Sequence, residues 1–227
     1  MLFRSYLRLK WARKYQTWRL NHWEHVIWSD ECYIFIGDTK GTVYVTRRPD
    51  EVLDDDCTIK TFSQSPIRVM IWACFAYGYK GPLVVLDYPG GPGGGMNSER
   101  YIEQVLSEDF KHFYGSVKRH RRYAIFQQDG AKCHTSKMTM QWLSKNSIKL
   151  FPHPASSPDL NPIENLWHTL KQHVRSREHP PTSLSELKQA VREAWDSISI
   201  DEINALVKSM PERVQAVLKA KGGHTKY

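Results

Sequence analysis

Three carboxylates of this chain lie where they could do chemistry together. Asp30 interrupts a run of apolar, strand-forming residues, Asp129 ends a second such run, and Glu164 follows after 34 intervening residues at the start of a helical pattern. Mg²⁺ prefers hard oxygen ligands such as carboxylates. Two such ions about 3.5–4 Å apart can activate the attacking oxygen and stabilise the leaving oxygen in phosphoryl transfer. The three acids therefore predict a metal-assisted phosphoryl-transfer site.

Each acid also has an ordinary structural interpretation. Asp30 fits an exposed position of an alternating strand, although an ionised group in an apolar strand is costly to bury without a partner. Asp129 begins an Asp-Gly turn, but it also ends a strand, where α/β proteins gather ligand sites. Glu164 stands three residues after Asn161, the spacing of a capping box, and capping alone would explain it. Asp159 is a rival third acid, for which a role within its turn is preferred.

Polar side chains near the acids are candidates for contact with phosphate. Lys132 and His134 closely follow the second acid, where the N–H groups of a predicted helix start could face an anion. Packing or capping is the simpler interpretation of His134. His168 and Lys171 share the helical face of Glu164, where they would contact DNA phosphates or solvent.

A surplus of positive charge favours a polyanionic partner without establishing one. The chain has 32 basic and 24 acidic residues, and cationic proteins bind nucleic acids by neutralising phosphates. The densest basic cluster spans 118–122, and its Lys and Arg side chains are Lys118, Arg119, Arg121 and Arg122. Such a cluster suits DNA contact or nuclear import, and a solvated helix end explains it nearly as well.

Length and composition indicate one large globular domain. The 227 residues are 41% hydrophobic, enough for a substantial core. The four cysteines form no Cys-x-x-Cys pair, so neither a zinc site nor a disulfide framework is indicated, and a reducing compartment is expected. The apolar stretch 69–86 is broken by Lys80 and two glycines, so no membrane span is predicted. Residues 1–14 are basic and free of acids, which imitates a transit peptide, but an exposed basic helix is preferred.

Hydrophobic periodicity predicts an α/β fold with a mixed sheet. After a helix over 2–24, strands are expected at 26–36, 42–46, 68–76 and 82–87, with a hairpin turn at 38–41, a long polar connection at 47–65 and a glycine-rich loop at 89–95. Beyond it, the pattern gives a helix over 97–114, a strand at 123–127, a helix at 136–145, a strand at 148–151, a helix after the proline-rich turn 152–162 to about 177, and amphipathic helices over 183–220.

Taken together, the motifs around the acids resemble one family. The strings are Trp28-Ser29-Asp30-Glu31, Val69-Met70-Ile71-Trp72, Met96-Asn97-Ser98-Glu99-Arg100-Tyr101, Phe126-Gln127-Gln128-Asp129 and Ser157-Pro158-Asp159-Leu160-Asn161-Pro162-Ile163-Glu164-Asn165-Leu166-Trp167. They resemble the catalytic domain of Tc/mariner transposases, in the Tc branch whose third acid is Glu. The resemblance covers essentially the whole chain, including the segment from Met210 to Tyr227.

The resemblance implies a ribonuclease-H-like fold: three antiparallel strands, then parallel strands, flanked by helices and followed by C-terminal helices. It implies that Asp30, Asp129 and Glu164 bind two Mg²⁺ or Mn²⁺ ions. On this resemblance, metal binding is the main role of Glu164 and helix capping is secondary. It further implies cleavage of DNA at transposon ends, transfer of the 3′-hydroxyl into target DNA at TA dinucleotides, a dimeric enzyme, and a nuclear location.

Two departures from the family keep other functions open. Full-length relatives carry paired helix-turn-helix modules ahead of the catalytic domain. We therefore expect residues 1–24 to be a basic lead-in from a missing DNA-binding region, 25–177 the catalytic domain, and 178–227 its helical extension. The glycine run 90–95 is also longer than is usual. The alternative function is a catalytically idle fragment that binds DNA, or dimerises with intact transposase and interferes with it. An RNA–DNA hybrid nuclease would share the fold but not the flanking motifs.

Overall fold

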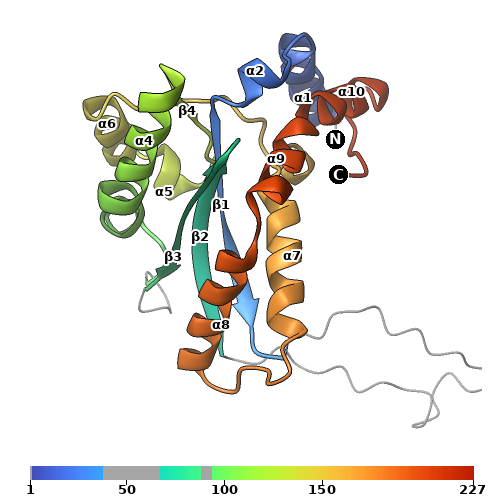
Figure 1. Ribbon diagram of the computed structural model, residues 1–227. Helices are drawn as coiled ribbons and strands as arrows, with labels where there is room; N and C mark the ends of the chain where they lie inside the picture. Colours follow the sequence, from blue (N-terminus) through green and yellow to red (C-terminus); the bar gives the residue numbers. More distant parts are fainter. Residues whose placement is uncertain (1, 38–66, 88–93) are drawn as a thin grey trace, which may run out of the picture.

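A five-stranded mixed sheet organises the molecule (Figure 1). The computed structural model describes residues 2–37, 67–87 and 94–227. In these ranges the strand order is β3-β2-β1-β4-β5. The antiparallel strands are β1 (Val26–Phe35), β2 (Arg68–Ala76) and β3 (Tyr79–Leu86), while β4 (Ile125–Phe126) pairs parallel with β1 and β5 (Lys149–Leu150) parallel with β4. The predicted α/β class with a mixed sheet is confirmed.

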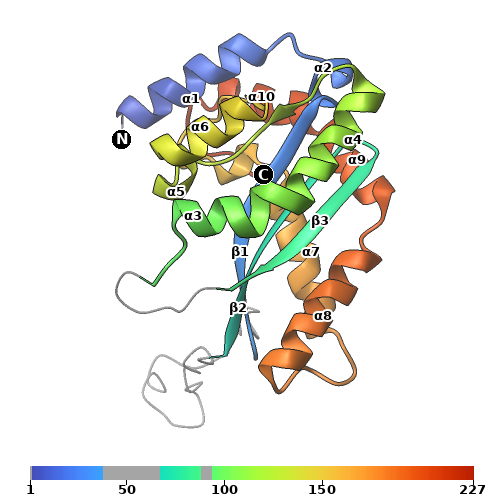
Figure 2. The same cartoon turned by 90° about the vertical axis from the view of Figure 1, so that its left-hand side faces the viewer.

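Helices cover both faces of this sheet (Figures 1 and 2). On one face lie α3 (Ser98–Tyr101), the π-helical segment η2 (Ile102–Phe110) and α4 (Lys111–Arg121), with α5 (Lys132–Thr135) and α6 (Lys137–Lys145) beside them. The other face carries α7 (Ile163–Arg175), α8 (Leu184–Ser197) and α9 (Ile200–Lys208). The remaining helices are α1 (Leu2–Tyr15), α2 (Leu20–Trp23), the short 3₁₀ turn η3 (Pro158–Leu160) and α10 (Met210–Lys219).

The alternation of side chains along the central strands builds two cores. In β1, Ile27 enters the core under η2 and α4, whereas Trp28 enters the core under α7 and α8. In β2, Ile71 enters the core under α7 and α8, whereas Trp72 enters the core under η2 and α4. Successive strand residues point to opposite faces, so a strand covered by helices on both sides is apolar throughout. Asp30 therefore shares the α7 face with Trp28.

Several predicted boundaries differ from the observed ones. The helix expected over 97–114 continues through η2 and α4 to Arg121, and it ends where Arg122 takes a positive φ of 64°. A hairpin between β2 and β3 was not predicted; it turns at Gly78, whose φ of +76° favours glycine. Four predicted features lie outside the described residues: the turn 38–41, the strand at 42–46, the connection 47–65 and residues 89–93 of the glycine-rich loop.

The amino-terminal helix is part of the main core. The predicted helix over 2–24 consists of α1 and α2, and the expectation of an exposed helix is wrong for one face of α1. Trp11 and Tyr15 are buried there and pack with Trp23 and Phe151. Helix α1 also packs against α10. No helix in the described ranges is both long and apolar enough to span a membrane.

A buried ion pair joins α1 to η3, and the C-terminal segment bonds to the same acid. Asp159 accepts hydrogen bonds from Arg8 Nη1 at 2.7 Å and Nη2 at 2.6 Å, and another from Thr225 Oγ1 at 2.8 Å. Arg213 Nη1 donates to the carbonyl of Asp159 at 2.8 Å. The expectation of a local turn role for Asp159 is thus wrong, because its partners are distant in sequence. We call Arg8, Asp159, Arg213 and Thr225 the junction.

Candidate active site

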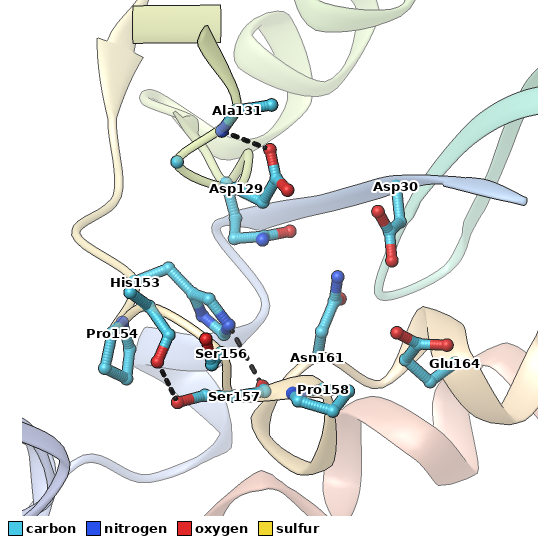
Figure 3. A pocket seen from close by; sticks show the side chains of 13 residues that line it. Asp30, Asp129, Ala131, His153, Pro154, Ser156, Ser157, Pro158, Asn161 and Glu164 are labelled. Carbon is cyan, nitrogen blue, oxygen red and sulfur yellow. Dashed lines mark hydrogen bonds between the residues drawn. The ribbon is translucent and has the colours of Figure 1, made fainter. Parts of the chain in front are cut away.

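The three predicted acids line one pocket of about 400 Å³ (Figure 3). Asp30 comes from the middle of β1, Asp129 from the segment after β4, and Glu164 from the first turn of α7. The loop 153–158 closes another side of the pocket. Elements far apart in sequence thus bring these acids to the same hollow, at the carboxyl end of β4, where ligand sites form in α/β folds.

Asp30 lies partly buried among other acids. Burial raises its pKa to about 8, and the charges of Glu31, Glu164 and Asp129 act in the same direction. A hydrogen bond from the backbone N–H of Glu31 to Asp30 Oδ1, at 2.8 Å, opposes the shift without cancelling it. Like charges gathered in this way disfavour ionisation until a cation balances them.

Glu164 faces Asp30 and does not cap its own helix (Figure 3). No side-chain capping bond occurs at the start of α7. Asn161, the expected cap, instead donates its Nδ2 to the carbonyl of Ser29 at 3.1 Å. The predicted capping box is therefore wrong. Burial raises the pKa of Glu164, while a hydrogen bond with Asp30 and the charge of Lys171 oppose the rise.

Asp129 is held in a turn with one carboxylate oxygen committed. Its Oδ1 accepts from the backbone N–H of Ala131 at 2.9 Å and contacts His134 Nδ1 at 2.5 Å. The hydrogen bond with His134 is the main cause that lowers the pKa of Asp129. The turn interpretation of Asp129 is correct, and the side chain still reaches the pocket.

His134 is buried between two acids. Its Nε2 lies 3.1 Å from Glu31 Oε1, and the residue is 2% exposed. Burial alone would lower the pKa of this imidazole, but the hydrogen bonds with Asp129, Cys133 and Glu31 outweigh it and raise the pKa to about 12. The packing interpretation of His134 describes its position, and neither ring nitrogen is left for direct contact with DNA.

Two amides fix the floor of the pocket to β1. Ser29 donates its N–H to Gln127 Oε1 at 3.1 Å and its hydroxyl to the Gln127 carbonyl at 2.8 Å. Its own carbonyl accepts from Asn161. These bonds tie the end of β4 and the start of α7 to the residue next to Asp30. Sequence reasoning missed Gln127, Asn161 and Glu31 in these roles, since their partners lie 98 to 132 residues away or, for Glu31, on another element.

The predicted phosphate contacts fall in different places. Lys132 and His168 are exposed and Lys171 is half-buried, on the α5 and α7 elements that carry or adjoin the acids. The basic cluster 118–122 ends α4 and precedes β4, whereas Asp129 follows that strand. Its exposed members are Lys118, Arg119, His120 and Arg122.

Arg121 is committed to internal contacts. Its Nη1 lies 2.8 Å from Glu24 Oε2, and its Nη2 donates to the carbonyl of Tyr77 at 2.8 Å. Its guanidinium also lies over the rings of Tyr77 and Tyr79. This side chain therefore links α4 to α2 and to the β2–β3 hairpin.

The donor set suits an oxygen-seeking divalent cation. It consists of carboxylates, the ligands that Mg²⁺ and Mn²⁺ prefer. Burial and the neighbouring acids raise the pKa of Asp30, and a bound cation would favour its ionised form. In the described part of the chain, no three His, Cys, Asp or Glu side chains form a ready-made metal cluster. The acids approach the pocket from different sides.

The known proteins to which this chain is similar are transposases, and the family model that it matches is of an endonuclease. Residues 93–188 match the family model described as DDE superfamily endonuclease. The transposase of transposable element Tcb2 from Caenorhabditis briggsae is 30% identical, over 97% of this chain and 77% of that protein. The Tc1 transposase of Caenorhabditis elegans is 29% identical over the same shares.

Solved structures share the fold. The Mos1 transposase catalytic domain, solved with Raltegravir and Mg, has a TM-score of 0.72 at 17% identity, covering 99% of this chain and 98% of that one. A pre-cleavage Mos1 transpososome has a TM-score of 0.72 at 19% identity, covering 98% of this chain and 64% of that one. The predicted ribonuclease-H-like fold is confirmed by these similarities.

Proposed function

We propose, on the premise that this chain belongs to the Tc/mariner transposase family, that it is a domain that cuts DNA at transposon ends and joins them to target DNA. The observation that carries the proposal is the meeting of Asp30, Asp129 and Glu164 at one pocket. Each comes from a separate element, and burial raises the pKa of Asp30 and of Glu164, with the charges of neighbouring acids adding to the rise at Asp30. Perturbed acids in a hollow favour a functional site over three unrelated structural roles.

The three acids are the proposed ligands of two Mg²⁺ or Mn²⁺ ions. Such ions, when bound, activate the attacking oxygen and stabilise the leaving oxygen of a phosphodiester. The solved Mos1 catalytic domain was obtained with Mg and with Mn, which supports this choice of metals. Asp129 offers Oδ2, since its Oδ1 is taken by Ala131 and His134. Asp30 and Glu164 offer carboxyl groups that face each other.

The proposed substrate is double-stranded DNA. Water attacks a phosphodiester at the transposon end and leaves a 3′-hydroxyl, which then attacks a phosphodiester of target DNA at a TA dinucleotide and displaces its 3′ oxygen. Lys132, His168 and Lys171 are the proposed phosphate contacts near the pocket, while Lys118, Arg119 and Arg122 offer a separate contact. The Mos1 paired-end complex with a transposon end supports DNA as partner and a dimeric assembly. A nuclear location follows from that substrate.

Nicking of supercoiled plasmid DNA in Mn²⁺ tests the proposal. The wild-type chain should convert supercoiled to open-circular plasmid, and Asp129→Asn should abolish the conversion. Asp196→Asn is the matched control, because Asp196 is an exposed acid on α8 away from the pocket. Absence of nicking by a folded, DNA-binding wild type would contradict the catalytic proposal and favour the idle, interfering fragment.

A further inference from the structure

Asp129 is the acid with the least support from its own element. Asp30 lies inside a ten-residue strand and Glu164 in a thirteen-residue helix. Asp129 instead follows β4, which has two residues, and its side chain is 52% exposed. A carboxylate in such a segment needs other contacts to keep one orientation, and orientation decides whether it can act as a ligand.

A buried imidazole supplies those contacts. His134 Nδ1 lies 2.5 Å from Asp129 Oδ1, and Nε2 lies 3.1 Å from Glu31 Oε1. Both ring nitrogens are thus engaged by carboxylates, and a doubly protonated ring donates to both. Asp129 Oδ2 has no hydrogen-bond partner among the described residues, so it is the oxygen left for the pocket.

The imidazole itself is fixed on its other sides. The ring packs on Tyr101, with ring centroids 4.3 Å apart. The Tyr101 hydroxyl donates to Gln128 Oε1 at 3.1 Å, and Gln128 Nε2 donates to the carbonyl of His134 at 3.1 Å. Tyr101 is 0% exposed and Gln128 8%. The ring is therefore held by a network in which each member is buried, and such networks restrict rotation.

Glu31 connects this network to the strand of the first acid. It is the neighbour of Asp30 in β1, where it pairs with Trp72 of β2. Because successive strand residues point to opposite faces, Asp30 points toward α7 and Glu31 toward α3 and α5. The chain Glu31–His134–Asp129 thus crosses from the rigid β1 to the segment that carries the second acid.

We propose that His134, anchored by Glu31, is a positioning residue that orients the Asp129 carboxylate so that Oδ2 faces the acid pocket. This inference rests on the proposed function, because it concerns the same site. The contact with Asp129 is the one that matters for the chemistry, and the contact with Glu31 fixes the ring. Lysine would lack the two opposed donors in one plane that the imidazole ring provides.

Two substitutions separate these contacts. His134→Asn places an amide N–H near the position of Nδ1 and keeps the bond to Asp129. His134→Gln places one near Nε2 and keeps the bond to Glu31 only. Both remove the ring from Tyr101, so they are matched for lost packing. We expect His134→Gln to lower the Mn²⁺-dependent nicking rate about 10–100-fold, as for removal of a group that orients a metal ligand. The rate of His134→Asn should stay within about threefold of wild type.

The metal requirement gives a readout that a purely structural role would not move. Mn²⁺ binding to the isolated chain, followed by electron paramagnetic resonance, should weaken about tenfold or more in His134→Gln and little in His134→Asn. The melting temperatures of the two variants should stay alike. Equal losses of Mn²⁺ affinity and nicking rate in both variants, in proportion to lowered melting temperatures, would overturn the positioning role. A wild type that binds no Mn²⁺ and does not nick would overturn the proposed function instead, and the positioning role with it.

Discussion

Asp159 and Glu164 stand five residues apart, yet their surroundings are opposite. Burial would raise the pKa of Asp159, but hydrogen bonds from Arg8 and Thr225 and the charge of Arg8 outweigh it and lower the pKa. Glu164 lies beside Asp30, and its pKa is raised by burial. In the junction Asp159 is paired with Arg8, and Arg213 donates to neutral oxygens of Ser209, Asp159 and Asn165. In the acid pocket His134 contacts Asp129, but burial still raises the pKa of Asp30 and of Glu164, and Lys171 opposes the rise at Glu164 only in part.

The difference separates structural acids from candidate ligands. A buried acid with a bidentate arginine needs nothing further, and removing one partner leaves an unpaired buried charge. Acids crowded together with raised pKa values are typical of sites that bind a cation or act in catalysis. Residue type and local sequence do not distinguish Asp159 from Glu164, but their long-range partners do.

Glu164→Gln should abolish Mn²⁺-dependent plasmid nicking, by about 100-fold or more, because it removes an ionisable oxygen from the proposed metal ligands. It should not lower the melting temperature, since Glu164 makes no capping bond in α7. A variant that nicks like wild type would remove Glu164 from the site.

Asp159→Asn should lower the stability of the fold, which Glu164→Gln should not. Urea unfolding should show a loss of about 3–5 kcal/mol, because Arg8 is left buried without its counter-charge. The lowered pKa gives the sign of the pH effect: the contribution of Asp159 is present above its unfolded-state pKa and is lost as pH falls through its lower folded-state pKa.

A double variant is the control for the junction. Arg8→Met with Asp159→Leu should recover part of the loss, since an apolar pair removes both buried charges. Folded Asp159→Asn at low temperature should still nick plasmid. Loss of nicking per folded molecule, with stability unchanged, would break the distinction between the two regions.

Asp30→Asn should stabilise the metal-free protein by about 1 kcal/mol or more at pH 8, because it removes a carboxylate from among like charges. Folding raises the pKa of Asp30 to about 8, so its protonated form favours the folded state and that contribution is lost as pH rises from about 4 to about 8. The gain from Asn should therefore vanish near pH 4. Urea unfolding at both pH values measures it, and a variant less stable than wild type at pH 8 would show that Asp30 is already balanced.

Lys132→Ala and Lys118→Ala should have the smallest effects. Each lysine is exposed, and losing one phosphate contact should weaken binding to a DNA duplex only a few-fold. The slope of log binding constant against log salt concentration should become about one unit less steep. Only Lys132 lies near the acids, so its loss should also slow nicking beyond the loss of binding. Equal effects of both substitutions on nicking would show that the region at the end of α4 is as close to the reacting DNA as α5.

The sequence predicted the parts that depend on local pattern. The strand around Asp30, the helix after Glu164 and the α/β class follow from periodicity, and the grouping of the three acids follows from motifs with a family resemblance. What failed depends on distant partners. Asn161 has the right spacing to cap α7, but its side chain bonds Ser29 instead. Asp159 looked like a turn residue because Arg8 lies 151 positions away.

His134 shows the same limit within the site. A histidine five residues after an acid predicts nothing by itself, and the meaning of the contact with Asp129 depends on Glu31, 103 positions earlier. The hairpin at Gly78 falls in the interval between the strands predicted at 68–76 and 82–87, and β3 begins at Tyr79, earlier than predicted.

In the proposed function, Asp30, Asp129 and Glu164 form one metal site. Crystals soaked in Mn²⁺ and measured for anomalous scattering test it most directly. We predict anomalous peaks in the pocket within about 2.5 Å of carboxylate oxygens from all three acids, close to the distances of oxygen-ligated divalent ions, and none at Asp159. A pocket without a peak at saturating Mn²⁺, or a peak that omits one of the three acids, would contradict the account.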